Sequence, residues 1–115
     1  MSGLDILNKA ILLLGYNQAT FSDNKSDFNI RALDVINNIC IDLGLTTIDS
    51  LTSIITADKR KFDALTTGVA MLLSLLEGDT NKNIIFTGLY NAKRAICLKT
   101  SSVVEDVMPY DDGGV

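Results

Sequence analysis

The sequence predicts an all-α protein: a compact domain of four helices, with a long loop between the second and third helices and an extended C-terminal tail. Apolar residues recur every three or four positions in four separate segments, which is the period of a helix with one buried face. Gly15, Gly44 and Gly78 directly follow three of these segments, and glycine often ends a helix in the left-handed conformation.

The first two helices are expected at residues 3–14 and 27–43, joined by a polar loop. The first has apolar residues on one face at Leu4, Leu7, Ile11 and Leu14. The second has its apolar face at Phe28, Ala32, Val35, Ile36, Ile39, Cys40 and Leu43. Its opposite face carries Arg31, Asp34, Asn38 and Asp42, which suits contact with solvent.

The helical period is lost between residues 45 and 56, which are rich in β-branched residues and interrupted by Ser50 and Ser53. We expect a long connection there, in which a short strand or bridge can form. A connection of this length is close to the upper limit for a plain loop, which hints at a role in binding or assembly.

The third helix is expected at residues 58–77 and is apolar on nearly all sides after its charged first turn. Such a helix is either the central helix of the domain or has one side against a partner subunit. We therefore expect Leu72, Leu73 and Leu76 to be largely buried.

The fourth helix is expected at residues 82–98. Its predicted core stripe is Ile85, Leu89, Ala92 and Ile96, and a neighbouring stripe holds Phe86, Tyr90 and Cys97. The period fails from Lys99 onward. This divides the chain into a helical domain, residues 1–100, and an extended acidic tail, residues 101–115.

The composition excludes several kinds of active site. The chain has no histidine, which removes histidine-based catalysis and histidine-ligated zinc. It has no phosphate-binding glycine loop and no complete calcium loop. We therefore predict no catalytic residue, cofactor or metal, and a protein that is not an enzyme. Cys40 and Cys97 are expected to be small buried hydrophobes in a reducing compartment.

Charge is unevenly distributed along the chain, whose formal net charge is −4. The last residues carry Glu105, Asp106, Asp111 and Asp112 without any base, whereas residues 80–104 carry bases and no acid. The tail is also apolar. An apolar and acidic segment suits docking on another chain, although it can also lie as a strap on its own domain.

Two sets of residues are therefore candidates for a protein interface. The tail contributes Val104, Val107, Met108, Tyr110, Asp111 and Asp112. The fourth helix of a neighbouring subunit contributes Tyr90, Lys93 and Arg94, although an aromatic residue at such a position is more often part of the core.

Four stretches, taken together and in order, resemble a known family. They are residues 4–15, residues 64–79 (ALTTGVAMLLSLLEGD), residues 86–94 (FTGLYNAKR) and residues 104–115 (VEDVMPYDDGGV). The chain resembles the small head–tail connector proteins of tailed bacteriophages, also called adaptor or head-completion proteins. Residues 45–56 depart from this resemblance.

The resemblance implies a structural virion or prophage protein at the portal vertex of the capsid, present in the host cytoplasm during assembly. Such proteins form a homo-oligomeric ring, typically dodecameric, below the portal protein. The ring extends the DNA channel and docks tail components or a second connector protein. DNA is only passing cargo, and no membrane is involved. The C-terminal segments of these proteins commonly contact neighbouring subunits or the portal.

The alternative is a small cytoplasmic helical regulator or DNA-binding module, with residues 59–61 (Lys-Arg-Lys) at a phosphate backbone. The acidic net charge and the lack of a clear helix-turn-helix spacing oppose this alternative.

Overall fold

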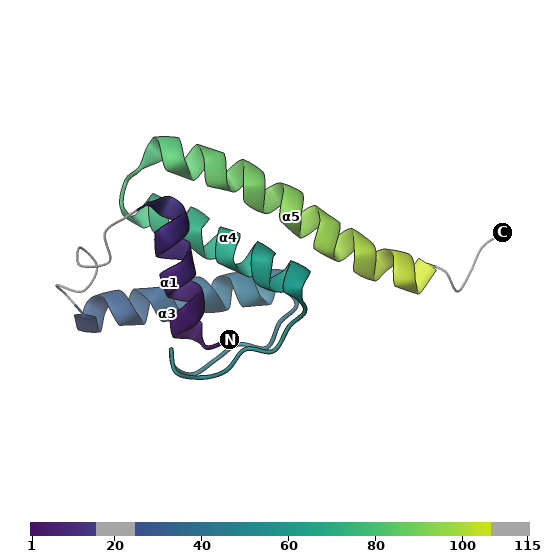
Figure 1. The fold of residues 1–115 in the computed structure, drawn as a ribbon, viewed down its shortest axis with the longest axis horizontal. Coiled ribbons are helices and arrows are strands. Elements are labelled where there is room, and N and C mark those ends of the chain that lie inside the picture. Colours follow the sequence, from purple (N-terminus) through teal and green to yellow (C-terminus); the bar gives the residue numbers. More distant parts are fainter. Residues whose placement is uncertain (16–24, 107–115) are drawn as a thin grey trace.

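The computed structural model describes residues 1–15 and 25–106, with side chains for residues 1–15 and 29–98. Its helices are α1 (Gly3–Leu14), α3 (Lys25–Leu43), α4 (Lys59–Leu76) and α5 (Thr80–Asp106), as Figure 1 shows. The predicted all-α class and the four-helix domain are confirmed. Within the described ranges, the only β-type pairing is a bridge between Ser2 and Ile54.

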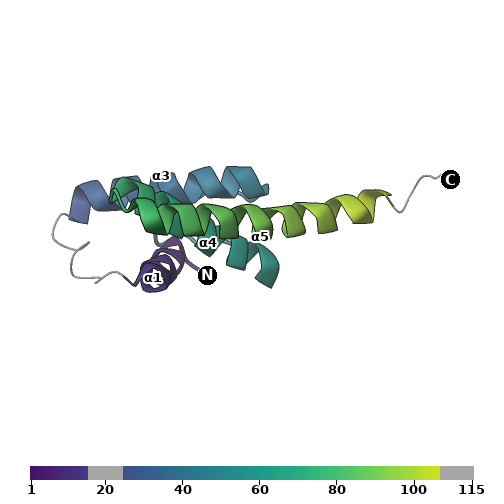
Figure 2. The same cartoon turned by 90° about the horizontal axis from the view of Figure 1, so that it is seen from above.

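Helix α4 is central, because it packs against α1, α3 and α5. Figure 1 shows α4 between α5 and α3, and Figure 2 shows α1 and α3 on opposite sides of the domain. The second half of α5 projects beyond the other helices in both views. The sequence-based expectation of a central third helix is therefore confirmed.

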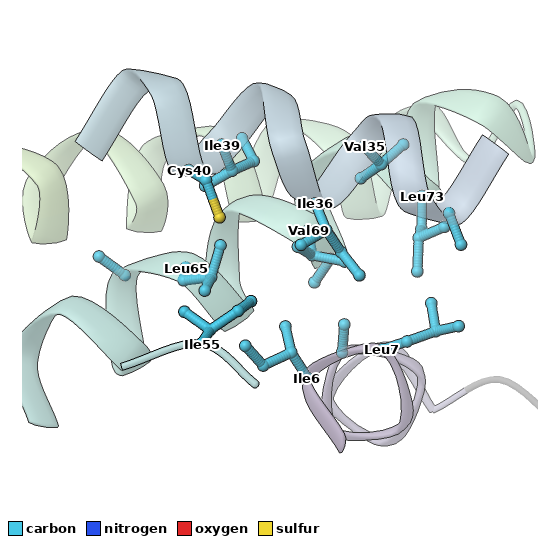
Figure 3. Close-up of a cluster of buried hydrophobic side chains, with 14 of the residues drawn as sticks. Ile6, Leu7, Val35, Ile36, Ile39, Cys40, Ile55, Leu65, Val69 and Leu73 are labelled. Atoms are coloured by element: carbon cyan, nitrogen blue, oxygen red, sulfur yellow. The ribbon is translucent and has the colours of Figure 1, made fainter. Parts of the chain in front are cut away.

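The hydrophobic core lies where α1, α3 and α4 meet, as Figure 3 shows. Its largest fully buried apolar side chains are Ile6, Ile36, Cys40, Leu43, Leu65, Val69 and Leu73. The apolar face predicted for the second helix is buried at each position whose side chain the structure describes; Phe28 lies outside that part. Strict helical spacing was thus sufficient to identify the buried face of α3.

Helix α1 begins with a capping box. The Ser2 hydroxyl accepts a hydrogen bond from the Asp5 amide, and the Asp5 carboxylate accepts one from the Ser2 amide. The helix ends at Gly15, whose φ of 74° is left-handed. The prediction for Leu4 was wrong, since it is 44% exposed. Because α3 and α4 both contact α1, the buried face includes Ile6 and Ala10 instead.

The long connection from α3 to α4 folds against the start of α1. The Leu4 amide donates to the Leu51 carbonyl at 2.9 Å, and the Ile55 amide donates to the Met1 carbonyl at 2.7 Å. The Asn37 side chain, on α3, both donates to the Ile48 carbonyl and accepts from its amide. The predicted bridge is confirmed, and the connection has a structural role because it satisfies backbone groups at the first turn of α1.

The end of α4 corrects one prediction. Leu73 is buried and Leu72 is half-buried, but Leu76 is 51% exposed, as is its neighbour Leu75 at 61%. A turn at Gly78, with φ of 70°, returns the chain as α5 along one side of α4 only. The last turn of α4 is apolar on all sides, but other helices cover only some of those sides.

Helix α5 corrects two predictions. The predicted core stripe is exposed, with Ile85 at 59%, Leu89 at 44% and Ile96 at 56%, and Ala92 is also exposed. The neighbouring stripe faces α4 instead: Tyr90 and Cys97 are buried and Phe86 is half-buried. Two adjacent stripes offered similar hydrophobicity, and the periodicity could not choose between them.

The second correction concerns the end of α5. The helix continues to Asp106 rather than ending near Leu98, so residues 101–106, which we assigned to the tail, are helical. No proline or glycine occurs between Lys99 and Asp106, so no residue type there is strongly unfavourable to a helix. The remaining tail, residues 107–115, lies outside the described residues.

Candidate functional site

The residues predicted on the fourth helix lie together and form contacts within the chain. Tyr90 is only 3% exposed, and its hydroxyl donates a short hydrogen bond to Asp42 on α3. Arg94 Nε donates to the same Asp42 oxygen at 2.8 Å. Lys93 Nζ donates to Asp63 on α4 at 2.9 Å. Each of these side chains therefore ties α5 to another helix.

This geometry corrects the assignment of Tyr90 to an interface, because a buried side chain cannot present itself to a neighbour. Lys93 and Arg94 are partly exposed, so their interface role stays a prediction, but each cation already pairs with a carboxylate. The sequence analysis placed Asp42 on a solvent-facing side of its helix. Asp42 contacts α5 because α3 and α5 lie next to each other in the fold. The apolar spacing within α3 alone could not predict this neighbour.

The Tyr90–Asp42 contact changes the acidity of both groups. The hydrogen bond from Tyr90 lowers the pKa of the Asp42 carboxyl, and Arg94 adds to that effect against the opposing desolvation. Burial raises the pKa of the Tyr90 hydroxyl, and the hydrogen bond to Asp42 raises it further. Tyr90 is therefore neutral and Asp42 charged across the physiological range.

The side chains of the tail residues predicted for the interface lie outside the described part of the chain. The backbone of Val104 belongs to α5, but its side chain lies outside the described part. Val107, Met108, Tyr110, Asp111 and Asp112 lie beyond the described residues.

An exposed apolar surface runs along α5. We call Ile85, Leu89, Ala92 and Ile96 the α5 stripe. They are spaced by four, three and four positions, which places them on one face of the helix. Exposed apolar side chains that share one face of a helix form a candidate interaction surface. The sequence had indicated the stripe itself, but not that it faces outward.

A pocket of about 820 Å³ forms a second candidate surface, between α1 and the start of α4. Leu12, Leu13 and Phe62 are among its apolar lining residues, and Lys9, Lys59 and Arg60 supply cations. We call it the α1–α4 pocket. Sequence reasoning missed it, although residues 11–14 are all apolar, which is more than one helix face can bury.

Neither cysteine has the features of a reactive nucleophile. Cys40 and Cys97 are buried, and burial raises the pKa of both thiols. Cys97 Sγ donates to the Arg60 carbonyl at 3.4 Å. Within residues 1–15 and 29–98, no three acidic or cysteine side chains gather as metal ligands would. The helices in the described ranges are too short or too polar to cross a bilayer.

The described residues present two candidate surfaces. One surface lies on α5 and the other between α1 and α4. No protein-family model, curated protein or solved structure matches this chain.

Proposed function

We propose that this protein is a structural subunit of a head–tail connector in a tailed bacteriophage or prophage. Copies of the chain form a homo-oligomeric ring below the portal protein, extend the DNA channel and dock a tail component or second connector protein. The observation that carries this proposal is the exposed α5 stripe, with Ile85 at 59% and Ile96 at 56% exposure. The family resemblance of the sequence supports the same conclusion.

Apolar surface that stays in contact with water is unfavourable for the protein. Burying a large aliphatic side chain contributes about 1.5–3 kcal/mol, so an exposed row of them favours association. A row with helical spacing fits a groove or a helix on the partner. When the α5 stripe packs on a different surface of a neighbouring copy, the contact joins unlike surfaces. Such contacts repeat from copy to copy and close into a ring when the rotation permits.

The charge of the chain is compatible with a conduit for DNA. A net charge of −4 does not favour a tight hold on the phosphate backbone, so DNA can pass as cargo. The subunit is then expected in the virion, at the portal vertex, after synthesis in the host cytoplasm.

The proposal is tested by native mass spectrometry and negative-stain imaging of the full chain, alone and with the portal protein of the same phage. We expect closed rings. Ile85→Glu should abolish them, because it places a charge in the α5 stripe. Ile41→Glu is the matched control, since Ile41 is 68% exposed but belongs to α3 and not to that stripe.

Circular dichroism of both variants checks that the helices still form. If the wild-type chain makes no ring with or without the portal, the proposal is wrong. Equal loss of rings in both variants would show that the α5 stripe is not the assembly surface.

A DNA-binding module is the second candidate. It is favoured by one observation: Lys9, Lys59 and Arg60 line a single pocket at the start of α4. Titration of duplex DNA into the full chain separates the two functions. Submicromolar, salt-sensitive binding at physiological ionic strength supports this second function, whereas a connector subunit shows only weak electrostatic association.

A further inference from the structure

The α1–α4 pocket combines an apolar wall with a basic rim. Leu12 and Leu13 on α1 are 67% and 53% exposed, and Phe62 on α4 lines the same space. Lys9 and Lys59 lie at the pocket from the two helices. A ligand for this pocket therefore needs apolar groups for the wall and negative charge for the rim.

The electrostatics of the pocket favour an anion. Neither Lys9 nor Lys59 forms an ion pair with another described side chain. The one acid among the described lining residues, Asp63, already pairs with Lys93, whose Nζ lies 2.9 Å from Asp63 Oδ1. The start of α4 is already capped, because the Asp58 carboxylate accepts a hydrogen bond from the Lys61 amide at 2.9 Å. A carboxylate from outside the domain would therefore meet the two lysines of the lining.

One segment of the chain has the matching chemistry. Glu105, Asp106, Asp111 and Asp112 account for the entire excess of acidic over basic residues. The apolar residues among them are Val107, Met108 and Tyr110, and no base occurs in the segment. Lys93 and Arg94 on α5 already pair with carboxylates of the same chain, so they are less suited to bind these acids. The pocket offers both lysines and apolar surface.

The direction of α5 indicates which copy supplies the segment. Both views show the end of α5 projecting away from α1 and from the rest of the domain (Figures 1 and 2). The acidic segment begins at Glu105, in the last turn of α5, at the far end of that projection. The projecting end of α5 is therefore accessible to a neighbouring copy.

We propose that the α1–α4 pocket binds the acidic C-terminal segment, residues 105–115, of a second copy of this chain. The proposal rests on the connector function and gives its ring a head-to-tail link. Apolar side chains supply most of the affinity, and the carboxylates set orientation and the rate of association.

The test mixes unlabelled and ¹⁵N-labelled full chains and treats them with a carbodiimide, which joins a lysine amine directly to a nearby carboxylate. Mass spectrometry then shows whether a linked pair contains one labelled and one unlabelled peptide. We expect mixed pairs that join Lys9 or Lys59 to Asp111 or Asp112. Lys61 is the internal control, because it lies in the same helical turn but not in the pocket lining.

A charge reversal sharpens the result. Lys59→Glu should lower the yield of mixed pairs at Lys9 about tenfold, because it replaces an attraction with a repulsion at the rim. Lys61→Glu should leave that yield unchanged. Both variants change the same helix end by the same charge, so a general effect on α4 would appear in both.

Absence of cross-links at Lys9 and Lys59 overturns the proposal, and so do equal yields at Lys61. Pairs that never mix isotopes also overturn it, because they place the segment on its own domain. Native mass spectra of the same samples separate this proposal from the connector function. Rings without these cross-links refute only the docking, whereas open chains with them support the docking and refute the ring.

Discussion

Helices α4 and α5 lie side by side, yet they are buried in different ways. Helix α4 has neighbours on several sides, and its middle residues, from Ala64 to Ala70, are all buried. Helix α5 packs mainly on α4 and leaves the α5 stripe in contact with solvent. The comparison teaches that an apolar stripe reports a preference for burial, while the number of neighbouring elements decides whether the fold itself supplies that burial.

The largest expected effect separates two leucines of α4. Leu73→Ala should destabilise the protein by about 2–5 kcal/mol, because Leu73 is 1% exposed in the core and its loss leaves a cavity. Leu76→Ala should cost less than about 1 kcal/mol, since Leu76 is 51% exposed. Urea unfolding of both variants measures this. Similar losses would contradict the difference in burial.

Two glycines provide the next comparison. A Cβ at Gly68 would lie 2.7 Å from Tyr90 Cε1 and 2.8 Å from Ile39 Cγ2, where α3, α4 and α5 meet. Gly68→Ala should therefore destabilise by about 1–3 kcal/mol through overpacking.

Gly88→Ala is the matched variant on α5. A Cβ there meets nothing within 4 Å, so the higher helix propensity of alanine should stabilise by about 0.5–1 kcal/mol. Thermal and urea unfolding should thus change in opposite directions for the two variants. A stabilising Gly68→Ala would show that α5 can move away from α4 at low cost.

Alkaline pH tests how α5 is held on α3. Burial raises the pKa of the Tyr90 hydroxyl above its ordinary value of 10.0. Its contribution to stability is therefore complete below about pH 10 and is lost as the pH rises above it, because the unfolded chain then releases the proton first. Tyr90→Phe should remove this part of the pH dependence and cost about 1 kcal/mol at pH 7. Urea unfolding between pH 8 and 11 measures both effects, and an unchanged alkaline slope would contradict the prediction.

Acid pH tests the same contact from the other side and should give the smallest effect. The hydrogen bond from Tyr90 lowers the pKa of Asp42 below its ordinary value of 3.8. The stabilisation is present above about pH 4 and is lost as the pH falls through the lowered pKa. In Asp42→Asn, the free energy of unfolding should depend less on pH in this acid range. The effect is small because the Asp42 side chain is 40% exposed.

The candidate surfaces were predictable to different degrees. The α5 stripe stood out as apolar before its outward orientation was known, and the acids of the tail were visible as a cluster. The α1–α4 pocket was not predictable, because Lys9 and Lys59 are far apart in the chain and meet only when α1 packs on α4. The ion pairs Lys93–Asp63 and Arg94–Asp42 could not be predicted for the same reason.

The sequence by itself determined the helices, the ends of α1 and α3 at glycine, and the buried face of α3, because helical period and glycine conformation are local properties. Only the tertiary structure decided which of two stripes on α5 meets α4, and it placed Leu76 in contact with solvent. Those outcomes depend on how many helices surround a given face. That number is set by packing across the whole domain, and no local pattern of residues encodes it.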